Sequence, residues 1–70
     1  MKTTIYRNTG PREDAVITTV KVERGPAHDR ASVWNRSGLS GVLIVNHGDG
    51  DWLAKRLIPQ DIREVEEYDD

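Results

Sequence analysis

The stretch GVLIVNHGDGDWLAKRLIP, residues 41–59, joins an apolar run to an amphipathic segment through a turn rich in glycine and aspartate. Residues 42–45 are apolar at every position, which is typical of a strand covered on both faces, so we expect them to form the central strand of a sheet. After the turn, large apolar residues recur at three- and four-residue spacing: Trp52, Leu53, Leu57 and Ile58. This spacing predicts a helix of about two turns that packs on the sheet and ends at Pro59.

The turn itself, HGDGD at residues 47–51, has a composition found in ligand-binding loops. A calcium loop of the EF-hand kind would need further acids and a Glu at its twelfth position. A phosphate loop would need Gly-Lys-Ser/Thr and no acids where the anion sits. We therefore expect Asp49 or Asp51 to cap the helix, and Asp51 to pair with Lys55 one turn further on.

Upstream of this stretch the sequence indicates three further strands. TTIYR (3–7) and AVITTVKVE (15–23) are rich in β-branched residues and are separated by a run of turn formers. RASVW (30–34) precedes NRSGLS, which we expect to form a hairpin with Ser37-Gly38 near its tip. In the strand at 15–23, alternate residues are expected to face the core: Val16, Thr18, Val20 and Val22.

The predicted fold is therefore an α+β domain, a four-stranded antiparallel meander with one short C-terminal helix packed on it. A small SH3-like β-barrel is the alternative, since a final strand at residues 62–65 (IREV) could close the sheet. We place a single domain at residues 1–60 and an acidic C-terminal segment at residues 61–70.

That acidic segment, DIREVEEYDD, carries six acids and one Arg, so its net charge is −5, and residues 1–60 carry +3 because the whole chain carries −2. Its composition favours a solvated, frayed terminus. Two ordered alternatives stay open. A capping box of Asp61 and Glu64 would start a helical turn, whereas the alternation in IREVE permits an edge strand, which is slightly favoured of the two. A mildly basic body with an acidic end disfavours nucleic-acid binding.

Length and composition limit the range of functions. A chain of 70 residues without Phe has few large side chains to bury, so a protein partner or a second copy of the chain would add apolar contact. The absence of cysteine excludes disulfides, thiolate zinc sites and cysteine nucleophiles, and favours an intracellular setting. No stretch approaches the roughly 20 apolar residues of a membrane span, and the first residues have no apolar core of signal-peptide length.

Patterns for catalysis and metal binding are weak. No serine lies in a G-x-S-x-G elbow, and so small a domain has little room for a cleft between paired carboxylates. We therefore expect no enzymatic activity and no cofactor. The expected hairpin register would place His28 opposite His47, with Asp29 and Asp49 nearby, a ligand set suited to zinc, nickel or copper. Exposed histidines that bind no metal are the favoured interpretation.

Recognition through the surface is the remaining route to function. Around the expected hairpin tip lie four residues that together resemble a binding hot spot: Trp34, Asn35, Arg36 and Leu39. Trp52, in the first helical turn, is a further candidate. Either tryptophan could instead belong to the core. The edges of a short meander offer a second route, by pairing with a strand of another chain.

The segment HDRASVWNRSGLSGVLIVNHGDGDWLAKRLIP contains V-W-N-R-x-G, then G-x-L-x-V, then G-D-G and a short helix ending in Leu. In this pattern residues 28–58 resemble small proteins of phages that infect actinobacteria. The resemblance implies an intracellular product of a phage genome with no assigned activity. It transfers no functional residue to this chain.

On this basis we expect an accessory protein that binds a host protein during infection, in the cytoplasm of the host cell. The alternative is a component of the virion, such as a capsid decoration or minor capsid protein, whose small core is completed by contacts in the shell. A small-ligand or metal-binding module is a third, less favoured interpretation. The expected partner is a protein, a homo-oligomer is compatible with either leading role, and neither a membrane nor nucleic acid is an expected partner.

Overall fold

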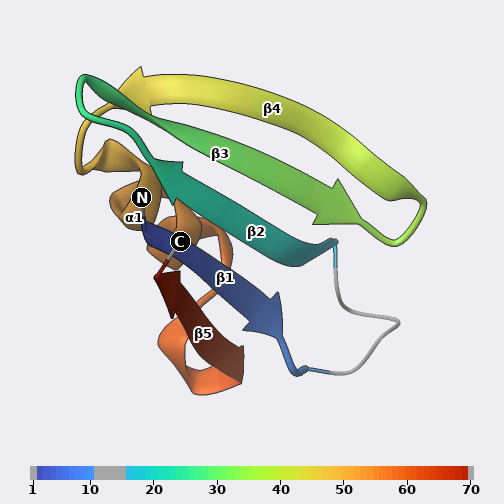
Figure 1. Ribbon diagram of the computed structural model, residues 1–70. Coiled ribbons are helices and arrows are strands. Elements are labelled where there is room, and N and C mark those ends of the chain that lie inside the picture. The colour runs from blue at the N-terminus through green and yellow to red at the C-terminus, as the bar shows by residue number, and fades with distance from the viewer. Residues whose placement is uncertain (1, 11–15, 70) are drawn as a thin grey trace.

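The computed structural model describes residues 2–10 and 16–69, which form one antiparallel sheet with a helix packed on it (Figure 1). In chain order the elements are β1 (Lys2–Asn8), β2 (Ile17–Arg24), β3 (His28–Asn35), β4 (Gly38–Asn46), α1 (Asp49–Leu57), the short 3-10 helix η2 (Gln60–Ile62) and β5 (Arg63–Asp69). The strand order across the sheet is β4-β3-β2-β1-β5. Within these residues, none of the helices has the length and apolar character needed to cross a membrane.

The predicted α+β class is confirmed, and strands β1 to β4 form a meander because each pairs with the next. The sheet has five strands rather than four. The additional strand, β5, pairs with β1 from Lys2↔Asp69 to Asn8↔Arg63, so the interpretation of this segment as a frayed end is wrong and the extended alternative is confirmed. β5 does not close the sheet into the alternative SH3-like barrel, because β4 and β5 lie at opposite edges.

Opposite charges accompany the pairing of β5 with β1. Arg7 donates a hydrogen bond to Glu66, and Lys2 Nζ lies 3.3 Å from Glu67 Oε2. These side chains are partly exposed, so each ion pair contributes at most about 1 kcal/mol. Two of the acids in this segment, Glu66 and Glu67, therefore pair with bases on the neighbouring strand.

The prediction that residues 42–45 form the central strand is wrong, because β4 lies at an edge of the sheet. Val42, Leu43 and Ile44 are 41%, 47% and 61% exposed. A run that is apolar on both faces usually belongs to a covered strand, but the position of a strand depends on its pairing partners. Here the chain leaves β4 for α1, and among the described residues β4 pairs with β3 alone.

The hairpin between β3 and β4 is displaced from the predicted register. Its tip is Arg36-Ser37, because Asn35 pairs with Gly38, and an irregularity at Ser40 shifts the remaining pairs. Ala31 consequently lies opposite Leu43 rather than Ile44. Since side chains alternate between faces, the shift turns Leu43 toward the helix side of the sheet and Ile44 away from it.

A similar irregularity changes the packed face of β2. Val20 and Val22 are fully buried, as predicted, but Val16 is 76% exposed. The register of β2 with β3 shifts between Ile17 and Thr19, so Thr18 is an extra residue and Ile17 packs on the core in place of Val16. A β-bulge of this kind reverses which residues face inward beyond it.

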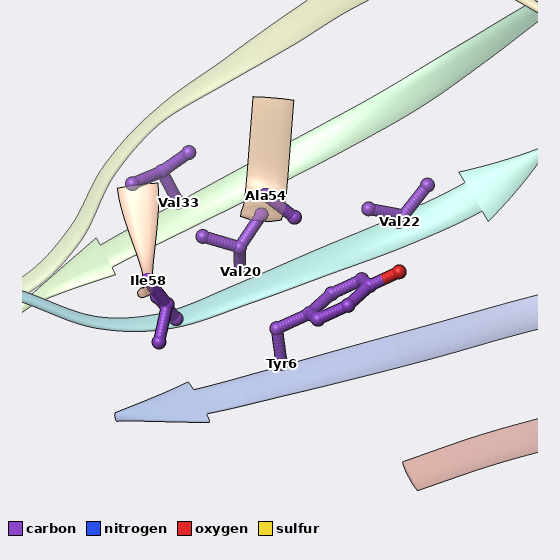
Figure 2. Close-up of a cluster of buried hydrophobic side chains, with 6 residues drawn as sticks. All are labelled: Tyr6, Val20, Val22, Val33, Ala54 and Ile58. Carbon is purple, nitrogen blue, oxygen red and sulfur yellow. The ribbon is translucent and has the colours of Figure 1, made fainter. Parts of the chain in front are cut away.

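The core lies between the sheet and α1, and Figure 2 shows its buried apolar side chains. They are Tyr6 from β1, Val20 and Val22 from β2, Val33 from β3, and Ala54 and Ile58 from the helix and the residue that follows it. The helix therefore packs through Gly50, Ala54 and Ile58, which recur every four residues. The predicted apolar face of α1 is wrong at Trp52, which is 60% exposed, because small residues are needed where the helix approaches the sheet.

Candidate functional site

The start of α1 is held by a side chain from the sheet. Asp29 of β3 is fully buried, and its Oδ2 accepts hydrogen bonds from the backbone N–H groups of Gly48, at 2.9 Å, and Gly50, at 3.2 Å. The N-cap residue is Gly48, with φ +94°, and no side chain of the turn caps the helix. The prediction that Asp49 or Asp51 is the cap is therefore wrong. A long-range carboxylate satisfies the same free N–H groups.

Gly50 has a packing role in the same place. A Cβ atom at this position would lie 2.7 Å from Val22 Cγ1 and 3.0 Å from Asp29 Oδ2. Contacts this short would force the helix away from the sheet and lengthen the two capping hydrogen bonds. Of the two glycines of HGDGD, Gly48 adopts a positive φ and Gly50 allows the helix to lie close to the sheet.

Asp51 ties the helix to β1 and β2 instead of pairing with Lys55 as predicted. Arg24 donates from Nε to Asp51 Oδ2 at 2.9 Å and from Nη2 to Thr4 Oγ1 at 2.7 Å, and the hydroxyl of Tyr6 donates to Asp51 Oδ1. Burial by itself would raise the pKa of Asp51. Hydrogen bonds from Tyr6 and Arg24 outweigh burial, so the pKa of this carboxyl lies below its ordinary value of 3.8. We call Tyr6, Arg24, Asp29 and Asp51 the helix-anchor cluster.

The helix-anchor cluster joins α1 to the sheet through hydrogen bonds between charged and polar side chains. Both oxygens of Asp51 accept hydrogen bonds from Arg24, and one also accepts from Tyr6, so each carboxylate oxygen is bound to a side chain of the sheet. Burial, followed by the hydrogen bond to Asp51, raises the pKa of Tyr6 well above its ordinary value of 10.0. The phenol therefore stays protonated at neutral pH.

The lowered pKa of Asp51 predicts acid destabilisation of the fold. Because this pKa lies below the unfolded value near 3.8, the Asp51 carboxylate contributes its full stability above about pH 4 and loses it as the pH falls through the folded-state pKa. We expect Asp51→Asn to be less stable than the parent protein at pH 7 and the difference to shrink below pH 4. Urea unfolding from pH 2.5 to 7 measures both curves. A difference that stays constant with pH would contradict the assignment.

The two histidines do not face each other, so the predicted metal ligand set is wrong in its register. His28 pairs with Asn46, while His47 places Nδ1 at 3.1 Å from the backbone oxygen of Gly25 and 3.5 Å from Asp29 Oδ1. Since both neighbours of Nδ1 are oxygens, this nitrogen carries the hydrogen and donates it to Gly25. In the described part of the chain, no three His, Asp or Glu side chains are grouped to hold a metal ion.

Two of the predicted binding residues, Trp34 and Leu39, come together on the face of the sheet opposite α1, and two more lie beside them at the hairpin tip. Val33 points into the core, so the next residue, Trp34, points to the other face, where it pairs with Leu39 across the hairpin. Asn35 and Arg36 follow at the hairpin tip. Leu39 is exposed and Trp34 is half-buried. We call these four residues the Trp34 patch.

A shallow hollow adjoins the Trp34 patch, with a volume of about 260 Å³. Trp34 and Asn35 contribute to its lining, together with residues of β1 and β2 that include Ile5, Arg7, Thr19 and Lys21. Thr19 and Lys21 alternate with the buried Val20 and Val22 and so lie on the face opposite α1, but the sequence alone does not connect them to the hairpin. Strand pairing makes that connection, because Thr19 pairs with Trp34.

Trp52 does not join the Trp34 patch. It lies on α1, on the other side of the sheet, and the guanidinium of Arg56 stands 5.0 Å from the centre of its ring. This contact covers part of an otherwise exposed indole and is worth about 0.5 to 1 kcal/mol at such a site. The five predicted binding residues therefore divide into a group of four and one distant tryptophan.

Comparison with models of protein families, with curated proteins and with solved structures found no match to this chain.

Proposed function

We propose that this protein is a non-enzymatic binding protein that recognises a protein partner through the Trp34 patch. The observation that supports the proposal most is the placement of Trp34 beside exposed Leu39 on the face of the sheet that α1 leaves uncovered. Tryptophan and arginine are the residue types that contribute most to binding energy at protein interfaces. Arg36 and Asn35 at the tip supply polar contacts around the apolar pair.

The charges near the hollow favour a protein partner over a polyanion. Arg7 is paired with Glu66, and Lys21 Nζ lies 3.9 Å from Glu23 Oε1, so each cation has an acidic neighbour. A phosphate backbone would meet these acids as well as the bases. An interface with a small apolar centre and balanced polar surroundings resembles the usual composition of transient protein complexes.

The resemblance of residues 28–58 to proteins of actinobacterial phages supports a host protein as the partner. In this proposal the protein acts in the cytoplasm of the infected cell. The second candidate is a virion component, and the exposed apolar edge of β4 favours it, because a protein that assembles in many copies can cover such an edge. Mass spectrometry of purified virions separates the two: many copies per particle support the capsid role, and absence from the particle supports the host-directed role.

Replacing Trp34 is expected to weaken partner binding far more than replacing Trp52. The wild-type protein is used to capture its partner from host cells, and the dissociation constant is then measured by calorimetry for the purified pair. We expect Trp34→Ala to raise it about 30-fold, equivalent to about 2 kcal/mol, and the matched variant Trp52→Ala to change it less than threefold. Equal effects of the two substitutions, or a larger effect at Trp52, would refute the proposed patch.

A further inference from the structure

The two edges of the sheet differ sharply in charge. From Ser37 to Asn46, covering all of β4, the chain has no charged residue and no proline, whereas β5 at the other edge carries Arg63, Glu64, Glu66, Glu67 and Asp69. Natural sheets protect their edges with charges, prolines or short strands, because an open row of backbone N–H and C=O groups can pair with another chain. Within the described residues, the outer side of β4 has no neighbouring strand.

The outer side of β4 is also regular enough to act as a template. The irregularity at Ser40 lies toward the hairpin tip, and beyond it Gly41 to Asn46 pair with β3 without a further register shift. Large apolar side chains project from both faces of this regular portion, with Val42 and Ile44 on one face and Leu43 on the other. These features are those of a strand that is completed by a partner strand.

We propose that β4 of one copy pairs antiparallel with β4 of a second copy, so that two five-stranded sheets become one continuous ten-stranded sheet. The charges of the two edge strands favour pairing of β4 with β4 over pairing that involves β5. Two β4 edges meet without any like charges, whereas two β5 edges would place glutamates opposite glutamates. A β5 edge on β4 would place charged side chains beside Val42 and Ile44 without partners.

Symmetry and side-chain matching give the register. A two-fold axis perpendicular to the sheet keeps each face on the same side, so paired residues must project from the same face. An axis at Leu43 pairs Val42 with Ile44 and Gly41 with Val45, so that residues 41–45 meet without a polar side chain, and the polar Ser40 meets the polar Asn46 at each end. An axis at Ile44 would place Val42 opposite Asn46, and an axis at Val42 would place the irregular Ser40 opposite Ile44.

A hollow beside β4 supports this pairing. It has a volume of about 300 Å³ and lies between the strand and α1, with Val33, Leu43, Leu53 and Leu57 among its lining residues. A partner strand along β4 would bring its own Leu43 to the open side of this hollow. The half-buried leucines of the helix would then lose further contact with water, which favours association.

Pairing through β4 leaves the Trp34 patch accessible. The two-fold axis places the uncovered faces of both sheets on the same side of the dimer, so a dimer would present two patches on one surface. The proposed dimer depends on residues 41–45, whereas the patch residue Leu39 lies in β4 outside that segment, so each proposal can fail without the other.

Cysteine cross-linking tests the register directly, because the natural chain has no cysteine. In the proposed dimer the two copies of residue 43 lie directly opposite each other, about 4.5 to 5.5 Å apart at Cα, within reach of a disulfide. The two copies of residue 44 lie beyond the limit of about 7 Å. Under mild oxidation we expect Leu43→Cys to form a covalent dimer and the control Ile44→Cys to remain largely uncross-linked. Equal cross-linking of both would refute the register.

Sedimentation equilibrium of the full chain tests the dimer itself. The wild-type protein is expected to dimerise at micromolar to millimolar concentration, and Ile44→Lys, which places a charge on the exposed edge, is expected to weaken dimerisation at least tenfold. Val16→Lys, at a residue that is more exposed than Ile44 but lies off this edge, is the control and should leave dimerisation unchanged. A wild-type protein that is monomeric throughout this range would overturn the proposal, as would equal effects of the two lysines. Partner binding by monomeric Ile44→Lys would show that the Trp34 patch functions independently.

Discussion

Replacing Ile58 with alanine is expected to lower the free energy of unfolding by about 2 to 5 kcal/mol. Ile58 is the largest fully buried side chain among residues 2–10 and 16–69. It follows α1 directly and packs with Val20 and Ala54 in the small cluster that joins helix to sheet (Figure 2). A domain of 70 residues has a total stability of roughly 4 to 10 kcal/mol. The substitution therefore removes a large part of it, and urea unfolding followed by circular dichroism measures the loss.

The control for this substitution is Leu39→Ala, which removes the same number of carbon atoms from an exposed position. We expect it to change the free energy of unfolding by less than about 0.5 kcal/mol. Its use also separates stability from recognition, since Leu39 belongs to the Trp34 patch. Similar losses for Ile58→Ala and Leu39→Ala would contradict the assignment of the core.

Replacing Asp29 with alanine is expected to cost about 2 to 3 kcal/mol, because it leaves the N–H groups of Gly48 and Gly50 without their acceptor at a buried helix start. The loss of stability should be largest at the start of α1. Urea unfolding measures the global change, and amide hydrogen exchange at Gly48 and Gly50 reports whether the start of α1 opens. We expect Asp29→Ala to increase the exchange rates of these two amides more than those of the other amides of α1.

Asp29→Asn separates capping from charge. An asparagine oxygen can accept the same two hydrogen bonds, and asparagine caps helices about as well as aspartate. The substitution leaves this acceptor in place and changes only Oδ1, the one buried side-chain oxygen or nitrogen in the described part of the chain without a hydrogen bond. We therefore expect Asp29→Asn to retain most of the stability that Asp29→Ala loses. Equal losses in the two variants would refute the capping role.

Local patterns predicted the secondary structure of this chain well where neighbouring residues decide it. The helix after HGDGD forms and ends before Pro59, and the hairpin joins the expected strands. The four residues of the Trp34 patch were found together because a hairpin brings its own tip residues into proximity. Trp52 was grouped with them only by residue type, and nothing in local sequence could show that α1 places it on the other side of the sheet.

The errors arose where distant residues compete for the same role. Asp49 and Asp51 have the right spacing to cap α1, yet Asp29 reaches the helix from β3 and Arg24 draws Asp51 toward β2. The capping signal of a turn is the same whether its own side chains or distant ones satisfy the N–H groups. Sequence alone therefore indicated that a helix begins here but not which carboxylate holds it.

The sequence by itself determined the periodicities, the turns and the charge contrast between the acidic end and the rest of the chain. Tertiary structure decided the order of the strands and the face on which each side chain lies. Single extra residues at Thr18 and Ser40 reverse inward and outward positions, because side chains in a strand alternate with a period of two. The position of β4 at an edge likewise depends on which strands pair with one another. Because of this position, the apolar residues of β4 are about half exposed to solvent.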